Sequence, residues 1–463
     1  MKDYDLIILG GGSAAFAAAI KAADYRAKVL VIESGVIGGT CVNRGCIPSK
    51  NLLWAASLAG NFASKNFRQI KLKAEYDMRS LIRQKDELVS MLRKTKYEDL
   101  LGYYPNIKFI KGTGKFDGNT VKVEDRRYTA RKYIIATGSR PFIPDIEGIS
   151  KINVITSNEV LNLDRVPESI GILGGGYISL ELGMYLGWLG SKVTILERGE
   201  RILKKYDPDM SEAVERYLEK NGMNIIKNVT FNAVSELNGR KTVDVTIKKD
   251  TQSFTFEELL IASGRSANTK DIGLESASVN INEKGAVTTD ETLKTSNPEI
   301  YAAGDVTGLN MLVTVAAKHG STAAENALFG QDLKIDYDLI PYAIYTDPQV
   351  AGVGLLEEQA KKRNIAYKVR TLDNILVPKA NTMRHTDGFV KMLTDIDDHI
   401  IGFHGFAPYI SEFVSEATLA IKFKMTPQDL SEIVHPYPTM SESLKMVAQS
   451  FFKDVSKLSC CAE

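Results

Sequence analysis

The chain has 463 residues, of which 44% are hydrophobic and 25% charged, and its formal net charge is +1. This composition is typical of a folded globular protein, argues against disorder, and gives no sign of a nucleic-acid or acidic-membrane partner. At roughly 100–200 residues per domain, the length allows two to four domains. The apolar runs are interrupted by glycine and too short to span a membrane. Residues 1–9, MKDYDLIIL, lack a secretion signal, so a cytoplasmic location is expected.

Residues 4–33 have the pattern of a dinucleotide-binding βαβ unit. An apolar run leads into Gly10-x-Gly12-x-x-Ala15, and a second apolar run ends at Glu33. In such a unit the first glycine makes a tight turn, and the second lets the backbone approach a pyrophosphate. The small third residue lets the helix pack on the strand, and the acid accepts hydrogen bonds from ribose. The order of these parts favours a dinucleotide site over a glycine-rich turn in an ordinary α/β protein.

The same pattern occurs a second time. Gly174-x-Gly176-x-x-Ser179 follows an apolar run, and the next apolar run ends at Glu197. The first glycine and the acid are 23 positions apart in both units. Two dinucleotide sites in one chain suggest a flavin and a nicotinamide that exchange a hydride.

Three further apolar runs end in glycine-containing loops. KYIIATGSRPFIP (132–144) and LLIASGRSAN (259–268) are predicted to be equivalent strands that leave the two nucleotide units. NPEIYAAGDV (297–306) ends in Gly304-Asp305. Asp305 can hydrogen-bond a ribityl hydroxyl of a flavin, and capping the following helix is an equally good physical role for it.

The remaining segments complete the predicted organisation. Residues 59–97 are polar with helical periodicity, which predicts a solvated helical hairpin, whereas from about residue 334 strand-like alternation gives way to helices. The predicted fold is α/β, with two Rossmann-like dinucleotide-binding domains and an α+β C-terminal domain. The expected boundaries are 1–150 for the first unit with its cysteine pair, 151–268 for the second, 269–335 for a segment returning to the first, and 336–463 for the C-terminal domain.

Two of the four cysteines, Cys41 and Cys46, stand at or before the N-terminus of a predicted helix with the sequence IPSKNLLWAASLA. The positive end of a helix dipole lowers a thiol pKa, and Lys50 adds a positive charge one turn further on. A packed structural pair or a zinc half-site is the alternative. Zinc needs further Cys or His ligands at short spacing, and the sequence has none nearby. A redox-active pair is therefore predicted.

The segment GGTCVNRGCIPSK resembles the active-site signature of the pyridine nucleotide–disulfide oxidoreductases, and the resemblance extends over essentially the whole chain. It implies a homodimer whose active site lies across the interface. It implies that Cys46 is the thiolate touching the flavin, Cys41 the outer exchanging thiol, and Tyr177 a lid over the flavin until nicotinamide arrives. The implied FAD residues are Gly10, Gly12, Ala15, Glu33, Thr40, Lys50, Gly114, Gly138, Glu181, Asp305 and Val313, with Lys50 and Glu181 as an ion pair near the flavin N5. The implied NAD(P)H residues are Gly174, Gly176, Glu197, Arg198 and Gly264.

One motif departs from the disulfide-reducing members of this family. They carry a general acid–base histidine in an H-P-T-x-S-E motif, in which the glutamate orients the histidine. Here the corresponding segment is HPYPTMSES, so Tyr437 takes the place of the histidine and Glu442 is the glutamate. Tyrosine, with a pKa near 10, is a poor proton shuttle at neutral pH but can donate a hydrogen bond beside a metal-bound thiolate. The alternative is that His435, two residues earlier, serves after a local shift in register.

The tail SLKMVAQSFFKDVSKLSCCAE resembles the C-terminus of the mercuric reductase branch of the family. Its adjacent thiols, Cys460 and Cys461, can hold the soft ion Hg²⁺ and pass it on by ligand exchange. The resemblance implies delivery to Cys41 and Cys46 of the other subunit. An accidental pair, a thiol reserve or a prenylation signal with an unsuitable terminal Glu are the alternatives. The sequence starts at the first unit, without the N-terminal metal-binding domain of many such enzymes, so metal capture is expected to depend on the tail or on small thiols.

These features predict an FAD-dependent enzyme that reduces Hg²⁺, supplied as a thiol complex, to Hg⁰ with NAD(P)H. A disulfide reductase such as dihydrolipoyl dehydrogenase is the enzymatic alternative. A metal-sequestering protein is a third possibility, although sequestration needs no hydride path. The choice of coenzyme stays open, because Glu197 favours NADH whereas Arg198, Arg201 and Lys204 can accept the 2′-phosphate of NADPH.

Overall fold

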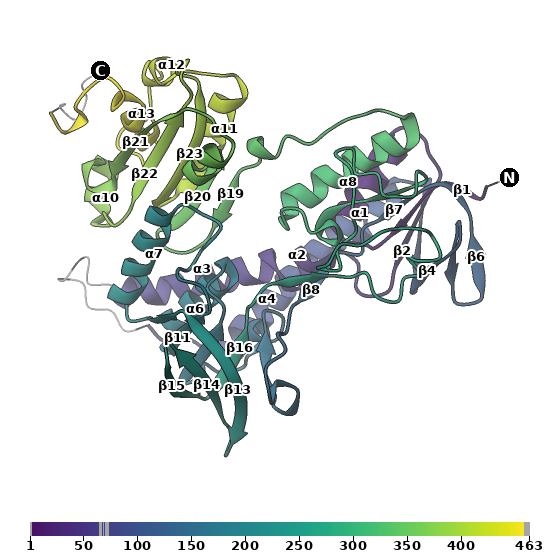
Figure 1. The fold of residues 1–463 in the computed structure, drawn as a ribbon, viewed down its shortest axis with the longest axis horizontal. Coiled ribbons are helices and arrows are strands. Elements are labelled where there is room, and N and C mark those ends of the chain that lie inside the picture. The colour runs from purple at the N-terminus through teal and green to yellow at the C-terminus, as the bar shows by residue number, and fades with distance from the viewer. Residues whose placement is uncertain (1, 64–66, 68, 70–73, 458–463) are drawn as a thin grey trace.

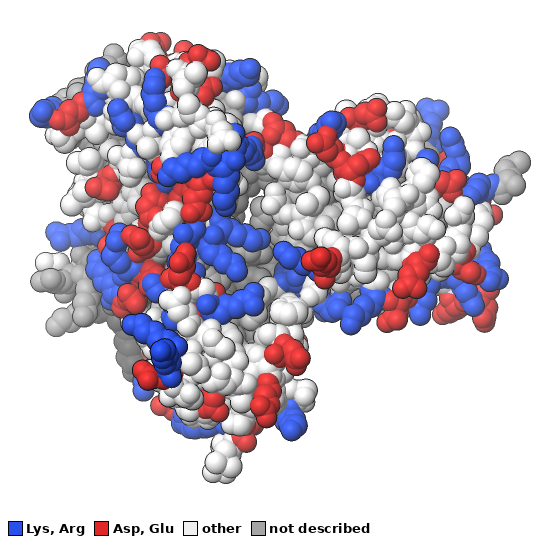
Figure 2. Space-filling model, viewed as in Figure 1, with Lys and Arg blue, Asp and Glu red and all other residues white. Residues whose placement is uncertain are grey.

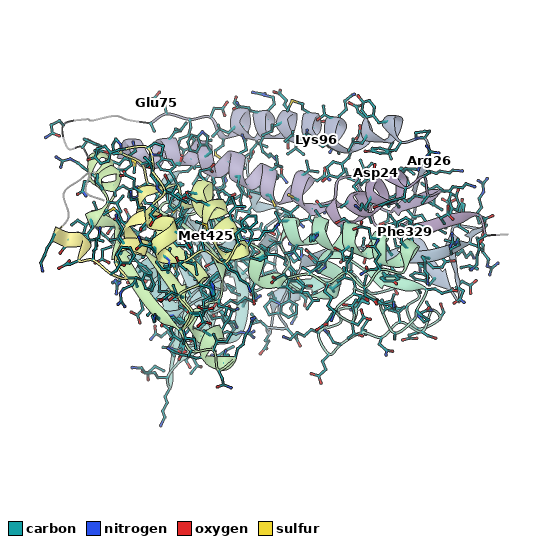
Figure 3. All side chains as sticks on the ribbon, turned by 90° about the horizontal axis from the view of Figure 1, so that it is seen from above. Asp24, Arg26, Glu75, Lys96, Phe329 and Met425 are labelled. Atoms are coloured by element: carbon teal, nitrogen blue, oxygen red, sulfur yellow. The ribbon has the colours of Figure 1, made fainter. Side chains whose placement is uncertain are left out.

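The first nucleotide unit is built on a parallel sheet with the strand order β18-β7-β1-β2-β3. The computed structural model describes residues 2–63, 67, 69 and 74–457. The helices α1 (Ser13–Asp24) and α8 (Val313–Phe329) lie against each other on this unit (Figures 1 and 3). Their contact is close because both are rich in small residues, and a Cβ on Gly320 would lie only 2.0 Å from the backbone oxygen of Ala14. The strands are β1 (Tyr4–Leu9), β2 (Val29–Glu33), β3 (Ile107–Lys111), β7 (Ala130–Ile135) and β18 (Ile300–Ala302).

The second nucleotide unit repeats this design with the parallel strand order β12-β11-β10-β16-β9. Its first helix, α6 (Tyr177–Trp188), is buried on most sides, as expected from its largely apolar sequence. The helix α7 (Pro208–Lys220) leads from this unit towards the C-terminal domain (Figure 1). The strands are β9 (Ile155–Thr156), β10 (Ser169–Leu173), β11 (Lys192–Glu197), β12 (Asn224–Lys227) and β16 (Glu258–Ile261).

Each unit also carries an antiparallel sheet that the sequence patterns did not reveal. The sheet of the first unit contains β4 (Gly114–Asp117), β5 (Thr120–Val123) and β6 (Arg126–Tyr128). That of the second contains β13 (Val229–Leu237), β14 (Arg240–Ile247) and β15 (Asp250–Phe256). The two exit segments, predicted to be equivalent, pair with each other, since β8 (Ser139–Pro141) and β17 (Arg265–Ala267) form an antiparallel ribbon between the units.

The cysteine segment opens a group of helices along one edge of the molecule. It comprises α2 (Gly39–Arg44), α3 (Cys46–Ala63), α4 (Met78–Arg93), a π-helix (Lys94–Glu98) and α5 (Leu100–Tyr103). Figure 3 shows α3 and α4 side by side. The predicted hairpin is not solvated throughout, because Met78, Lys85 and Val89 form a buried stripe on α4. The ammonium group of Lys85 is satisfied there by the Asn162 side-chain oxygen at 2.7 Å.

The C-terminal domain is an antiparallel sheet with helices, which confirms the predicted α+β character. Its strand order is β19-β20-β23-β22-β21, and α11 (Ile410–Lys422) packs on β20 and β23. The strands are β19 (Tyr342–Ile344), β20 (Gln349–Gly354), β21 (Lys368–Asp373), β22 (Phe389–Thr394) and β23 (Ile400–Ala407). The other helices are α9 (Glu357–Lys362), α10 (Pro378–Met383), α12 (Pro427–Ser431) and α13 (Glu442–Gln449). Short 3₁₀ helices cover Ile149–Lys151, Val160–Asn162, Gly304–Thr307, Tyr337–Leu339, Asn374–Leu376 and Val455–Lys457. Within the described ranges, no helix has both the length and the apolar character needed to cross a membrane.

Candidate active site

A cavity of about 340 Å³ lies where the strands of the first sheet end. The glycine loop of the first unit, the cysteine helices, both exit segments and the loop after β18 all contribute to its walls. This is the edge at which open parallel sheets bind ligands. The predicted site residues that line it are Gly12, Glu33, Thr40, Cys41, Cys46, Lys50, Gly138, Tyr177, Glu181, Asp305 and Val313. The sequence therefore identified residues from distant segments that the fold brings together.

Cys41 and Cys46 are unequal thiols within this cavity. Cys46 is the first residue of α3, as predicted, and Cys41 lies in α2. The hydrogen bond from Cys41 and the nearby charge of Lys50 lower the pKa of Cys46 from 9.0 to about 7, against the opposing effect of burial. The same hydrogen bond, together with burial, raises the pKa of Cys41. Near neutral pH Cys46 is therefore the thiol that ionises, whereas Cys41 stays protonated.

A fixed ion pair adjoins the thiols. Lys50 is four residues after Cys46, on the same face of α3, and its ammonium group is 2.6 Å from the carboxylate of Glu181 on α6. The second oxygen of the buried Glu181 carboxylate accepts a hydrogen bond from the Tyr345 backbone N–H at 2.9 Å. The Tyr345 ring also lies 5.0 Å from the Lys50 ammonium group. Tyr345, which follows β19, was not predicted, because nothing in its local sequence indicates a contact with α3.

Tyr177, at the start of α6, covers another part of the cavity wall. Burial raises the pKa of Tyr177 to about 12, and the charges of Arg265 and Asp305 are among those that act on it. The hydroxyl therefore stays protonated at neutral pH. It is available in the cavity as a hydrogen-bond donor and not as a base.

Asp305 is fixed by residues of both exit segments. Its carboxylate accepts a hydrogen bond from the Ser139 hydroxyl at 2.5 Å. Arg265 donates to that hydroxyl at 2.7 Å and to the Ser139 carbonyl at 2.9 Å. The following helix, α8, has Leu312 at its N-cap, so Asp305 is not the cap of that helix. Ser139 and Arg265 were missed as site residues, although the matched exit sequences contain both of them.

The glycine loops provide room for dinucleotides. A Cβ atom on Gly138, Gly176 or Gly264 would meet nothing within 4 Å, whereas one on Gly39 would lie only 2.6 Å from the Gly12 Cα. The acids at the strand ends are held identically in the two units, each by two backbone N–H groups of the neighbouring loops. The residues present therefore fit two bound dinucleotides.

Several predicted cofactor residues lie outside the cavity lining. Gly10 and Gly174 adopt positive φ angles of 120° and 112° at the start of their loops, as a tight turn requires. Gly114 lies in β4, where a Cβ would approach Leu9 at 2.6 Å. The others are Ala15 in α1, Gly176 and Glu197 in the second unit, the exposed Arg198, and Gly264 in the second exit. Their contacts with a cofactor stay predictions.

The histidine-containing motif lies in the C-terminal domain, away from the cavity lining. Tyr437 is 51% exposed there. The carboxylate of Glu442 accepts a hydrogen bond from the Thr439 backbone N–H at 3.0 Å. The His435 ring faces the Glu416 carboxylate at 2.9 Å and the Ile433 carbonyl at 3.1 Å, and its side chain is 4% exposed. The hydrogen bond to Glu416 raises the pKa of His435. Cys460 and Cys461 lie outside the described residues.

These features are those of an FAD-dependent oxidoreductase with a dithiol centre. The chain belongs to the pyridine nucleotide-disulphide oxidoreductase family, whose profile matches residues 4–320, and the family's dimerisation domain matches residues 340–448. It is 42% identical to a mercuric reductase of Lysinibacillus sphaericus, over 99% of this chain and 85% of that protein. It is 41% identical to a mercuric reductase of Staphylococcus aureus, over 99% and 84%. Among solved structures, the Cu(II) complex of the HOCl-induced flavoprotein disulfide reductase RclA from Escherichia coli has a TM-score of 0.86 and 30% identity, and covers 98% of this chain and 100% of its own.

Proposed function

We propose that this flavoprotein oxidoreductase reduces mercuric ion: NAD(P)H + Hg²⁺ → NAD(P)⁺ + Hg⁰ + H⁺. FAD, when bound, supplies the two-electron relay between the coenzyme and the metal. The similarity to mercuric reductases over nearly the whole chain supports this substrate. Two thiolates are suitable ligands for Hg²⁺ because the ion is soft and prefers two-coordinate sulfur ligation.

The two active-site thiols have different tasks in this proposal. Cys46 takes the metal first because its thiolate form, which needs to lose no proton, is already well populated near neutral pH. Cys41 then loses its proton when the metal becomes its partner, since a bound cation strongly favours the thiolate. Lys50 balances the thiolate charge and is itself held by Glu181. Tyr177 supplies a neutral hydroxyl that can assist in holding or releasing the ion.

The hydrogen bonds and burial of His435 are the observation that favours a metal ion over a disulfide as the substrate. Disulfide reduction needs a group that protonates the departing thiolate. Both ring nitrogens of His435 face oxygen acceptors and its side chain is buried, so this histidine is occupied by Glu416 and Ile433. Tyr437, which takes the motif position, has no useful proton-shuttle chemistry at neutral pH. Metal reduction needs no such shuttle.

The proposal also includes a homodimer and delivery of the metal by the C-terminal cysteines. The match to the family's dimerisation domain supports a homodimer. In that dimer Tyr437 of one subunit would approach the thiols of the other. Cys460 and Cys461, outside the described residues, would deliver Hg²⁺ from one subunit to Cys41 and Cys46 of the other. Ligand exchange between thiol pairs moves the ion without releasing it.

One anaerobic assay tests the proposed substrate. NAD(P)H oxidation is followed first with Hg²⁺–cysteine complexes, then with lipoamide and with oxidised glutathione, and volatile mercury is measured in parallel. Oxidation matched by release of Hg⁰ is expected. Oxidation only with a disulfide would refute mercury reduction, and metal binding without coenzyme consumption would indicate sequestration. Replacing Cys460 and Cys461 by Ser is expected to abolish turnover of tightly chelated Hg²⁺ while leaving flavin reduction unchanged; unchanged turnover would remove the relay.

Disulfide reduction is the second candidate. The unequal thiols of Cys41 and Cys46 suit thiol–disulfide exchange, and RclA, similar over nearly the whole chain, is described as a flavoprotein disulfide reductase. Because that relative was solved as a Cu(II) complex, Cu²⁺ belongs among the acceptors in the same assay.

A further inference from the structure

The loop between α12 and α13, residues 432–441, carries Tyr437 and is largely exposed. Val434 is 81% exposed and Tyr437 51%, whereas His435 and Thr439 are half-buried. The loop follows α12, at an end of the C-terminal domain where Figure 2 shows acidic side chains among uncharged ones. An exposed loop keeps one conformation only if some of its residues are held by the rest of the fold. The position of Tyr437 therefore also depends on the contacts of its neighbours.

Thr439 holds the downstream side of this loop. Its hydroxyl donates a hydrogen bond to the Pro436 carbonyl at 2.8 Å, and its backbone N–H donates to the Glu442 carboxylate at 3.0 Å. Pro436 belongs to the loop itself, and Glu442 is the first residue of α13. These two hydrogen bonds therefore join the loop only to itself and to the helix that directly follows it.

His435 holds the upstream side and contacts a helix that is distant in the sequence. Its Nε2 atom lies 2.9 Å from a carboxylate oxygen of Glu416, on α11, and its Nδ1 atom lies 3.1 Å from the Ile433 carbonyl oxygen. Both oxygens are acceptors, so both ring nitrogens donate and the ring is an imidazolium ion. The His435 side chain is 4% exposed, so solvent screens little of its ion pair with Glu416.

A proline stiffens the connection between His435 and Tyr437. Pro436 has a φ angle fixed at about −65° and disfavours a helical conformation at the residue before it. A displacement of His435 is therefore passed on to Tyr437 with little backbone freedom to absorb it. A neutral imidazole has a single N–H donor, so loss of the proton would break one of the two hydrogen bonds that His435 makes.

We propose that His435 and Glu416 form a clamp that positions Tyr437, and that the protonated imidazole is the working state of this clamp. His435 is a positioning residue, since it acts only through the tyrosine that the loop presents to the thiols of the partner subunit. The inference rests on the proposed reduction of Hg²⁺ across a homodimer interface.

The surroundings of His435 keep the clamp closed at neutral pH. The hydrogen bond to Glu416 is the main cause that raises the pKa of His435, and it outweighs burial. The Ile433 carbonyl acts in the same direction, and Lys445, on α13, acts against it. Because the pKa is raised in the folded protein, the clamp is complete below the ordinary histidine value and loosens as the pH rises through the raised one.

The first test compares turnover of Hg²⁺–cysteine complexes by flavin-loaded variants. His435→Phe keeps a ring but removes both hydrogen bonds, and it is expected to lower turnover by about tenfold while flavin reduction by the coenzyme stays unchanged. In a Tyr437→Phe background the same substitution is expected to have no further effect, because the clamp acts through Tyr437. Losses that multiply in the double variant would overturn the proposal.

The second test uses the pH profile of the same reaction. Glu416→Gln keeps an acceptor for His435 but removes the charge, so it is expected to move the alkaline loss of turnover to lower pH by about one unit. His399→Phe is the matched control, since His399 lies 3.3 Å from the Asp395 carboxylate in another turn of the same domain. Identical alkaline limbs in the wild type and in Glu416→Gln, or an equal shift in the control, would contradict the clamp.

Hydrogen exchange near neutral pH gives a readout that needs no mercury. Amide exchange of residues 433–439 is expected to rise by about tenfold in His435→Phe and in Glu416→Gln, and to stay unchanged in His399→Phe. Unchanged exchange in the first two variants would show that the pair does not hold the loop. If the wild-type enzyme does not reduce Hg²⁺, the proposed function is refuted, and the exchange rates still decide whether the clamp exists.

Discussion

Replacing Cys41 tests the origin of the lowered pKa of Cys46. The hydrogen bond from Cys41 is the largest cause of the shift from 9.0 to about 7. A shift of this size corresponds to about 2.7 kcal/mol between the two protonation states. At pH 7 it separates a Cys46 that is roughly half thiolate from one that is about 1% thiolate. Cys41→Ala removes the donor and is expected to raise the pKa of Cys46 by more than about one unit, whereas Cys41→Ser keeps an O–H donor and should leave it near 7.

Alkylation by iodoacetamide measures this difference directly, because the thiolate is the reacting species. The rate is recorded from pH 5 to 10 on flavin-loaded protein in which Cys460 and Cys461 are serine, so that only Cys46 reacts among the active-site and tail thiols. Near pH 7 the Ala variant is expected to react at least about fivefold more slowly than the Ser variant. Equal midpoints in the two variants would refute the hydrogen-bond explanation. A larger shift in Lys50→Met with Cys41 intact would assign the effect to charge instead.

Three further predictions concern residues outside the thiol pair. Tyr437→His is expected to raise lipoamide reduction by about tenfold or more, since it restores a group that titrates near neutral pH; unchanged activity would show that the motif position does not decide the substrate. Burial lowers the pKa of His319 to about 4, below the 6.5 of the unfolded chain, so the folded state binds fewer protons between these values and stability falls as pH drops from 6.5 to 4. His319→Asn should remove roughly 3 kcal/mol of that loss in urea unfolding, and identical pH slopes would contradict the assignment. Lys391→Met leaves Asp207 and Glu357 without their buried cation and should cost about 3–5 kcal/mol in the same measurement; a loss below about 1 kcal/mol would show that the cluster is solvated.

The features that could be predicted from the sequence are those formed by residues close to one another in the chain. The glycine loops, Glu33 and Glu197 stand at short fixed spacings within one βαβ unit, and Cys46 starts the helix that the following residues specify. Contacts across elements were not predictable. Arg265 and Ser139 are 126 positions apart, and the pairing of their two strands is what joins them. The capture of His435 by Glu416 similarly depends on the packing of a loop against α11, which no periodicity records.

The prediction that residues 59–97 form a solvated hairpin was partly wrong for a related reason. On α4, Met78, Lys85 and Val89 share one face, but a lysine within that stripe gives it a polar appearance in the sequence. The helix buries this lysine because Asn162 and Asp86 satisfy its ammonium group at 2.7 and 2.6 Å. Periodicity identifies which residues share a face. It does not show whether a charged residue on that face is hydrogen-bonded or ion-paired by a residue of another segment.

The duplicated units indicate where the specificity of this enzyme resides. Both hold their acid with two backbone N–H groups at nearly identical distances, so the fingerprint itself cannot distinguish one nucleotide task from the other. The difference comes from what each unit packs against. The glycine loop of the first unit and the helix that begins with Cys46 line the same cavity, so a thiol pair lies in the predicted flavin site. In the second unit, the loop after β11 contacts α9, because Arg201 in that loop forms an ion pair with Glu358. Substitutions in these neighbours should therefore change function more selectively than substitutions in the glycine loops, which would weaken nucleotide binding in general.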